Sequence, residues 1–111
     1  MCFTKAYDVS PTSLSRARRA GLSACEHVED LLSDPFIDIV LVATPPVFHY
    51  PYGKKVLEAD KHLILEKPAT MNAEELSELI ALAERKGRLI TVHQNRRNDA
   101  DFLAIQTLVR E

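Results

Sequence analysis

Apolar residues along this chain fall alternately into short continuous runs and into sets spaced three or four positions apart. Continuous runs are typical of strands buried in a parallel sheet, and the wider spacing is typical of helices that cover such a sheet. The clearest run covers residues 37–43, where only Asp38 is polar, and it predicts a strand buried on both faces. The clearest helical face is formed by Leu76, Leu79, Ile80 and Ala83.

Extended to the whole chain, this pattern predicts strands and helices in strict alternation. Strands are expected at residues 3–7, 24–27, 37–43, 61–66 and 89–93. Helices are expected at residues 11–20, 28–32, 47–59 and 72–86, and from residue 99 or 100 onward. Ser10 and Asn72 stand where N-caps are needed, and Gly21 and Gly87 stand where helices should end. The fold class is therefore α/β, a doubly wound parallel (Rossmann-like) sheet built from right-handed βαβ units.

Composition limits the size and the partners of this protein. The 111 residues are enough for one domain at most, and the net charge of −2 gives no broad basic surface for nucleic acid. No apolar run approaches the length of a membrane span, and residues 1–5 lack the apolar core of a signal peptide. A cytoplasmic protein that binds neither membrane nor nucleic acid is expected. No metal site is expected, because the histidines are scattered without ligand spacing.

Candidate binding residues follow the strands, because ligands of such sheets bind beyond the carboxyl ends of the strands. Asp8 ends the first strand, and a carboxylate there can accept hydrogen bonds from both hydroxyls of an adenosine ribose. It would repel the 2′-phosphate of NADP, so it favours NAD. The alternative is an aspartate that only starts a turn.

The next strand is followed by Thr44 and Pro45, which form a rigid turn ahead of a helix N-terminus. Free backbone N–H groups at such a terminus suit phosphate oxygens. His49 lies in the first turn of that helix and could approach a cofactor. The alternative is an ordinary half-exposed histidine on the helix.

The two remaining strand ends carry cations. Lys67, between Glu66 and Pro68, places an ammonium where it could polarise a substrate oxygen during hydride transfer. The alternative is a surface ion pair between Glu66 and a neighbour, with the proline only ending the strand. Asn95 and Arg96, followed by a second arginine, could hydrogen-bond an amide or a phosphate, or could form a solvated loop.

In this order and at these spacings, the segments resemble the Gfo/Idh/MocA family, named for glucose-fructose oxidoreductase and inositol dehydrogenase. The resemblance rests on four motifs, Glu29-Asp30-Leu31-Leu32, Ala43-Thr44-Pro45-Pro46 with His49, Glu66-Lys67-Pro68 and Asn95-Arg96-Arg97. It implies a nucleotide-binding domain of an NAD(P)-dependent oxidoreductase that acts on a secondary alcohol of a sugar or polyol.

The resemblance also implies roles for single residues. Asp8 would face the adenosine ribose, Thr44, Pro45 and His49 would line the cofactor cleft, and Lys67 would be the catalytic residue near the nicotinamide and the substrate. Glu66, Asn95 and Arg96 would complete the cofactor contacts. NAD is the expected cofactor, NADP being less likely, and a cis peptide bond is expected before Pro68.

Two departures from the family pattern shape the remaining expectations. The family begins with a strand and a Gly-x-Gly-x-x-Gly turn, whereas the three glycines here are Gly21, Gly53 and Gly87. The family also places a second, substrate-binding domain after the region of Asn95. Residues 1–111 are thus expected to be a partial nucleotide-binding domain without activity of its own. The alternative is a non-catalytic remnant or self-associating module that binds no cofactor, and a homo-oligomer is possible because strand 37–43 would have an unpaired edge.

Overall fold

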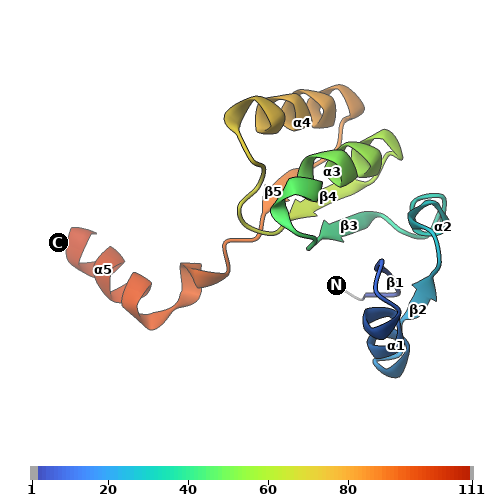
Figure 1. The fold of residues 1–111 in the computed structure, drawn as a ribbon. Helices are drawn as coiled ribbons and strands as arrows, with labels where there is room; N and C mark the ends of the chain where they lie inside the picture. Colours follow the sequence, from blue (N-terminus) through green and yellow to red (C-terminus); the bar gives the residue numbers. More distant parts are fainter. Residues whose placement is uncertain (1–2, 111) are drawn as a thin grey trace.

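The computed structural model describes residues 3–110 as an α/β fold in which two small parallel sheets lie side by side (Figure 1). One sheet pairs β1 (Lys5–Tyr7) with β2 (Ser23–Cys25). The other has the order β3 (Ile39–Val42), β4 (His62–Leu65) and β5 (Ile90–Val92). Every strand pair is parallel, so the predicted strand order along the chain and the fold class are confirmed.

Helices connect the strands at the predicted places. The α-helices are α1 (Pro11–Arg19), α2 (Val28–Leu32), α3 (His49–Glu58), α4 (Ala73–Lys86) and α5 (Ala100–Arg110). The short 3-10 turns are η1 (Pro46–Phe48) and η2 (Asn95–Asn98). Within residues 3–110, no helix combines the length and the hydropathy that crossing a membrane requires.

The predicted helix ends are confirmed. The Ser10 hydroxyl accepts a hydrogen bond from the Ser13 N–H at 3.4 Å, and the Asn72 side chain accepts one from the Glu75 N–H at 2.8 Å. Gly87 ends α4 with a φ of 62°, a left-handed conformation that glycine adopts at little cost. Each of these helix ends depends on residues that are close in the chain, which is why the sequence alone locates it.

The core lies between the three-stranded sheet and the two helices that cover one of its faces, α3 and α4 (Figure 1). It is formed by Val42, Val56, Leu57, Leu63, Leu65, Leu79 and Ala83. Gly53 lets α3 approach closely, because a Cβ atom there would lie 3.0 Å from a methyl of Leu63 and 3.2 Å from one of Leu79. Ile80, expected on the buried face of α4, is instead 41% exposed.

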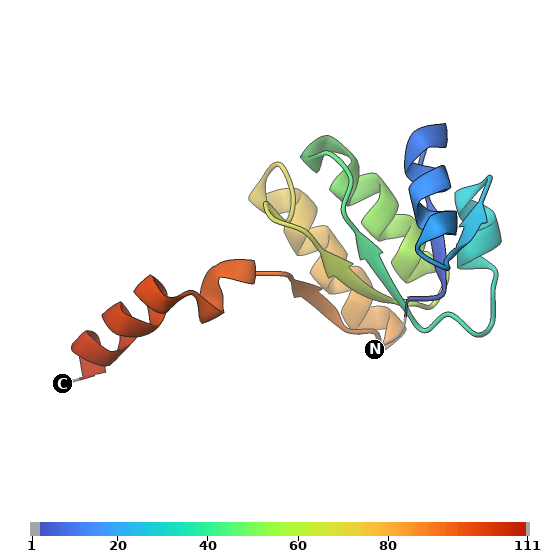
Figure 2. The ribbon, with the colours of Figure 1, turned by 90° about the horizontal axis from the view of Figure 1, so that it is seen from below.

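The opposite face of this sheet is uncovered in the part of the chain that the structure describes. Ile39 and Leu41 on β3 are 43% and 38% exposed, whereas Val42 between the sheet and the helices is only 5% exposed. The prediction that strand 37–43 is buried on both faces is therefore wrong. Its physical reason is that α3 and α4 lie on the same face, while α5 extends away from the sheet and buries none of its residues (Figure 2).

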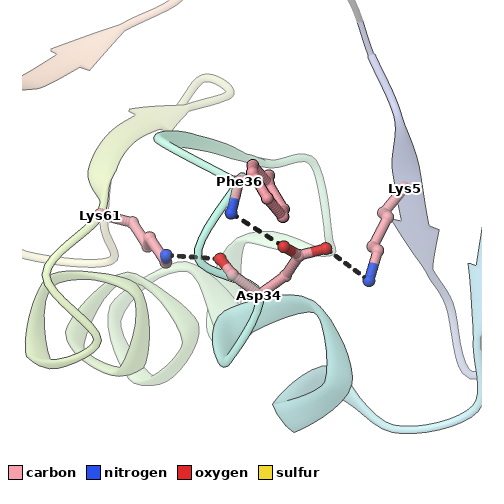
Figure 3. A network of polar contacts seen from close by, with 4 residues as sticks. All are labelled: Lys5, Asp34, Phe36 and Lys61. Atoms are coloured by element: carbon pink, nitrogen blue, oxygen red, sulfur yellow. Dashed lines mark hydrogen bonds and ion pairs between the residues drawn. The ribbon is translucent and has the colours of Figure 1, made fainter.

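Asp34 connects the two sheets (Figure 3). Its carboxylate lies 2.6 Å from the Lys5 ammonium on β1 and accepts a 2.8 Å hydrogen bond from the Phe36 N–H. Its backbone carbonyl accepts a 2.8 Å hydrogen bond from the buried Lys61 ammonium, just before β4. Lys5 and Lys61 stand at the amino ends of their strands, so this network lies at the opposite edge from the residues that follow the strands.

Candidate functional site

The register of the three-stranded sheet brings the ends of its strands together. Val42 is aligned with Leu65, and Leu65 with Val92. The Glu66 N–H donates to the Val42 carbonyl at 3.0 Å, and the His93 N–H donates to the Leu65 carbonyl at 2.8 Å. Since the strands are parallel, the turns that follow β3, β4 and β5 meet at one edge, where ligands of such sheets bind.

Glu66 and His93 form a hydrogen-bonded pair at this edge. His93 Nδ1 lies 2.6 Å from Glu66 Oε1. A carboxylate only accepts, so Nδ1 carries the proton. This bond holds the pKa of the Glu66 carboxyl below its ordinary value, and the backbone N–H and charge of Lys67 act in the same direction. Glu66 therefore presents an ionised carboxylate beside Lys67, and the neighbour considered in its alternative role is His93, which it contacts through this hydrogen bond.

Lys67 is exposed, and among residues 3–110 its ammonium forms no hydrogen bond or ion pair. The Lys67–Pro68 peptide bond is cis, as the resemblance implied. The edge of the sheet thus offers a carboxylate, which can accept hydrogen bonds from hydroxyls, next to an ammonium, which can donate to an oxygen.

His49 is buried rather than half-exposed, with 1% of its surface accessible. Its Nε2 lies 2.9 Å from the Thr44 carbonyl oxygen. Its Nδ1 lies 2.8 Å from the Pro68 carbonyl oxygen and 3.3 Å from that of Ala69. Both ring nitrogens face backbone oxygens, so the ring offers no free polar atom to a cofactor in this conformation.

Asp8 lies at the end of β1, in a hollow of about 510 Å³ that is also lined by Leu14, Arg18 and Glu26. One of its carboxylate oxygens accepts a 2.7 Å hydrogen bond from the Ser10 N–H. The turn considered as the alternative is therefore present. This turn uses Oδ1 of the exposed Asp8 side chain, and a carboxylate has a second oxygen that could accept from a hydroxyl.

Asn95 and Arg96 are not brought into contact with the other candidates. They lie on η2, where the chain leaves the sheet toward α5 (Figure 2), and both are exposed. Arg96 Nε is 3.8 Å from Asp99 Oδ2 on the same segment. The three-stranded sheet therefore unites Thr44, His49 and the Glu66-Lys67 pair, while Asp8 belongs to the neighbouring sheet.

His93 was not among the residues singled out from the sequence. Its signal was its position as the last residue of the predicted strand 89–93, since His93 directly follows Val92, which is aligned with Leu65, and Glu66 directly follows Leu65. That register becomes visible only when two strands are paired.

Residues 3–110 contain groups suited to both ends of a dinucleotide, but they contain no glycine-rich turn. A carboxylate that can hold a ribose lies in a hollow at β1, and a carboxylate and an ammonium lie at β4. Two of the three glycines, Gly21 and Gly87, follow helix ends, and Gly53 lies inside α3. Between residues 3 and 110, backbone N–H groups for a pyrophosphate are offered at most by the turn of Thr44 and Pro45 that precedes α3.

Comparison with known proteins is consistent with this geometry. Residues 3–94 match the family model GFO_IDH_MocA, described as an oxidoreductase family with an NAD-binding Rossmann fold. A scyllo-inositol 2-dehydrogenase (NADP(+)) of Bacillus subtilis is 43% identical over 84 residues, which cover 76% of this chain and 24% of that protein. A dTDP-3,4-didehydro-2,6-dideoxy-alpha-D-glucose 3-reductase of Saccharopolyspora spinosa is 40% identical over 91 residues, covering 78% of this chain and 27% of that protein.

Solved structures agree with the fold. An NAD-binding protein from Listeria innocua superposes with a TM-score of 0.94 at 37% identity, over 96% of this chain and 32% of that one. A biliverdin reductase from Synechocystis, solved with biliverdin and NADP+, superposes with a TM-score of 0.83 at 28% identity, over 91% of this chain and 32% of that one. The chain therefore spans about a quarter to a third of the length of the proteins it resembles.

Proposed function

Since the chain belongs to the Gfo/Idh/MocA oxidoreductase family, with an NAD-binding Rossmann fold, we propose that it is the nucleotide-binding part of an enzyme that oxidises a secondary alcohol of a sugar or polyol with NAD. The adenosine ribose would lie at Asp8. The nicotinamide end would lie at Glu66 and Lys67. The turn of Thr44 and Pro45 would border the phosphates between them.

The pairing of an ionised Glu66 with the neighbouring Lys67 carries this proposal. His93 holds the Glu66 carboxylate in place at 2.6 Å, so the carboxylate is oriented before a ligand arrives. It can accept a hydrogen bond from a ribose hydroxyl. The adjacent ammonium can then donate to the oxygen of the group that reacts.

Lys67 would act on the substrate oxygen. The bound nicotinamide supplies the hydride acceptor. By donating a hydrogen bond to the substrate oxygen, the Lys67 ammonium would stabilise negative charge on that oxygen. The position of Lys67 after β4, exposed and without another side-chain partner among the described residues, supports this role.

Asp8 supports a preference for NAD over NADP. A carboxylate at a ribose site repels the 2′-phosphate that distinguishes NADP. Two of the similar proteins carry NADP in their descriptions, so the proposed preference for NAD rests on Asp8 alone. Arg18 lines the same hollow, and its positive charge would soften that repulsion.

Binding is tested by titrating NADH into the folded chain and following nicotinamide fluorescence. We expect saturable binding that Asp8→Asn and Glu66→Gln weaken by about tenfold each, the order expected for losing one charged hydrogen-bond acceptor. Glu84→Gln, which removes an exposed carboxylate on α4, is the matched control and should leave the affinity unchanged. A folded sample that binds no NADH would instead support the non-catalytic remnant or self-associating module.

The placement of the nicotinamide is tested by comparing NAD+ with ADP-ribose, which lacks that ring, in NMR titrations of the labelled chain. Both ligands should shift the Asp8 amide signal. Only NAD+ should shift the Lys67 and His93 amide signals strongly. Equal shifts of the Lys67 signal by both ligands would contradict the proposed orientation.

A further inference from the structure

His49 is a buried polar side chain that the proposed chemistry does not use. Its ring is 1% exposed and contacts carbonyl oxygens on two different turns. We propose that His49 is a positioning residue, which ties the turn after β3 to the turn after β4 and thereby fixes Lys67. This inference deepens the proposed function and rests on it for the role of Lys67.

The two turns need such a tie because they are rich in proline. The first contains Pro45 and Pro46, and the second contains Pro68. Proline has no N–H, so these residues cannot donate the backbone hydrogen bonds that normally hold neighbouring segments together. Their carbonyl oxygens still accept, so a side-chain donor can join one turn to the other.

The His49 ring has one nitrogen facing each turn. Nε2 lies 2.9 Å from the Thr44 oxygen, and Nδ1 lies 2.8 Å from the Pro68 oxygen. Both partners are carbonyl oxygens, which only accept, so a ring nitrogen that bonds to either of them must donate. The ring therefore spans the distance between the turns and sets it.

The consequence for the site is local. The Pro68 carbonyl belongs to the residue that directly follows Lys67, so the bond from Nδ1 fixes the backbone from which the ammonium projects. The Thr44 carbonyl directly precedes Pro45, so the bond from Nε2 fixes the turn on the opposite side. Loss of both bonds would leave β3 and β4 paired but would release the turns beyond them.

Amide hydrogen exchange in the full chain, measured by NMR, tests the tie without any cofactor. The Phe48 N–H, which bonds to Pro45 at 2.9 Å, reports on the first turn. The Met71 N–H, which bonds to Glu75 at 3.0 Å, reports on the second. The Leu63 N–H, bonded to Leu89 at 2.9 Å inside the sheet, reports on global unfolding.

Two conservative variants separate the two bonds. Asparagine carries its amide nitrogen at the place of Nδ1, and glutamine carries its own at the place of Nε2. His49→Asn should leave the exchange of the Met71 amide slow and accelerate that of the Phe48 amide. His49→Gln should have the reverse effect on the two amides. His49→Phe, which fills the space without a donor, should accelerate both amides by about tenfold while Leu63 is unchanged, as expected for local opening.

NADH affinity gives the functional readout. We expect His49→Phe to weaken NADH binding by about tenfold, with partial rescue in the asparagine and glutamine variants, because a loosened turn must be ordered on binding. His62→Gln is the matched control, since the His62 ring also bonds to the backbone, at Leu89, but at the opposite edge of the sheet.

Three results would overturn the proposal. The first is a His49→Phe variant whose Phe48 and Met71 amides exchange as in the wild type. The second is a uniform acceleration that includes Leu63, which would show a general core role. The third is an asparagine or glutamine variant that restores slow amide exchange in neither turn. If the wild type bound no NADH, the proposed function would fail while the exchange data still decided whether the tie exists.

Discussion

His93 and Glu66 face one another across neighbouring parallel strands, with 2.6 Å between His93 Nδ1 and Glu66 Oε1. The pair exists because β4 and β5 are in register at their carboxyl ends, where Leu65 is aligned with Val92. It holds an acceptor beside Lys67, the residue to which we assign the chemistry. An interaction between two side chains 27 positions apart thus prepares the candidate site.

The first prediction concerns the charge of Glu66. Replacing His93 with phenylalanine removes the hydrogen bond that is the main cause of the lowered pKa, so the pKa of Glu66 should rise toward its ordinary value. Titration of the labelled carboxyl carbon by NMR measures the change. His62→Phe, at the other edge of the sheet, should leave this pKa unchanged, and an equal shift in both variants would contradict the assignment to His93.

The second prediction concerns cofactor choice. Asp8→Ser removes the charge that repels a 2′-phosphate, so the ratio of the NADPH to the NADH dissociation constant should fall by at least about tenfold, since like charges in contact are strongly unfavourable. Fluorescence titration with both cofactors measures the ratio. Asp38→Ser, which removes an exposed carboxylate near the start of β3, should not change it. An unchanged ratio in Asp8→Ser would refute the placement of the ribose.

The third prediction concerns the link between the two sheets. The hydrogen bond from Lys5 is the main cause of the lowered pKa of Asp34. A group with a lowered pKa in the folded state stabilises the fold above its unfolded pKa, and this contribution is lost as the pH falls through the folded value. Asp34→Asn should therefore reduce the free energy of unfolding at pH 7, and the difference from the wild type should shrink in acid, below about pH 4.

Urea unfolding at neutral and acidic pH measures this difference. The pKa of Lys5 is raised by the same pair, so its contribution persists to alkaline pH and does not obscure the acid effect. Asp38→Asn serves as the control for removing a nearby charge. If Asp34→Asn were destabilised equally at neutral and at acidic pH, the cause would not be the ionised carboxylate.

The fourth prediction concerns the close approach of α3. Gly53→Ala places a methyl group 3.0 Å from a methyl of Leu63 and 3.2 Å from one of Leu79, and both leucines are buried in the core. Overpacking costs roughly 1–3 kcal/mol, and the better helix propensity of alanine offsets about 1 kcal/mol of it. We expect a net loss of about 1 kcal/mol in urea unfolding. Lys54→Ala on the exposed side of α3 should change stability by less than about 0.5 kcal/mol, and a stabilised Gly53→Ala would contradict the packing.

The fifth prediction concerns the uncovered face of the sheet. Exposed apolar sheet surface promotes association, so the chain should self-associate at raised concentration in analytical ultracentrifugation. Leu41→Lys should reduce this association and preserve the fold, because the side chain is 38% exposed. Val42→Lys, one position along and facing the core, should unfold the chain. If Leu41→Lys associated as strongly as the wild type, this face would not be the contact surface.

Local patterns in the sequence were sufficient to locate the elements of the fold. The apolar run at residues 37–43 located β3, and the caps at Ser10 and Asn72 located the starts of α1 and α4. Such signals act over a few residues, since a cap or a helical turn is completed by atoms close in the chain. The position of Lys67 after β4 was predictable for the same reason.

Contacts between distant segments were decided only by the tertiary structure. The apolar run did not reveal that Ile39 and Leu41 face outward, because that depends on which face α3 and α4 cover. The sequence marked His49 as a candidate, but only the fold placed its ring between the Thr44 and Pro68 carbonyls. Burial and the sharing of hydrogen bonds depend on strand register and on the layering of helices, and no short stretch of sequence contains either.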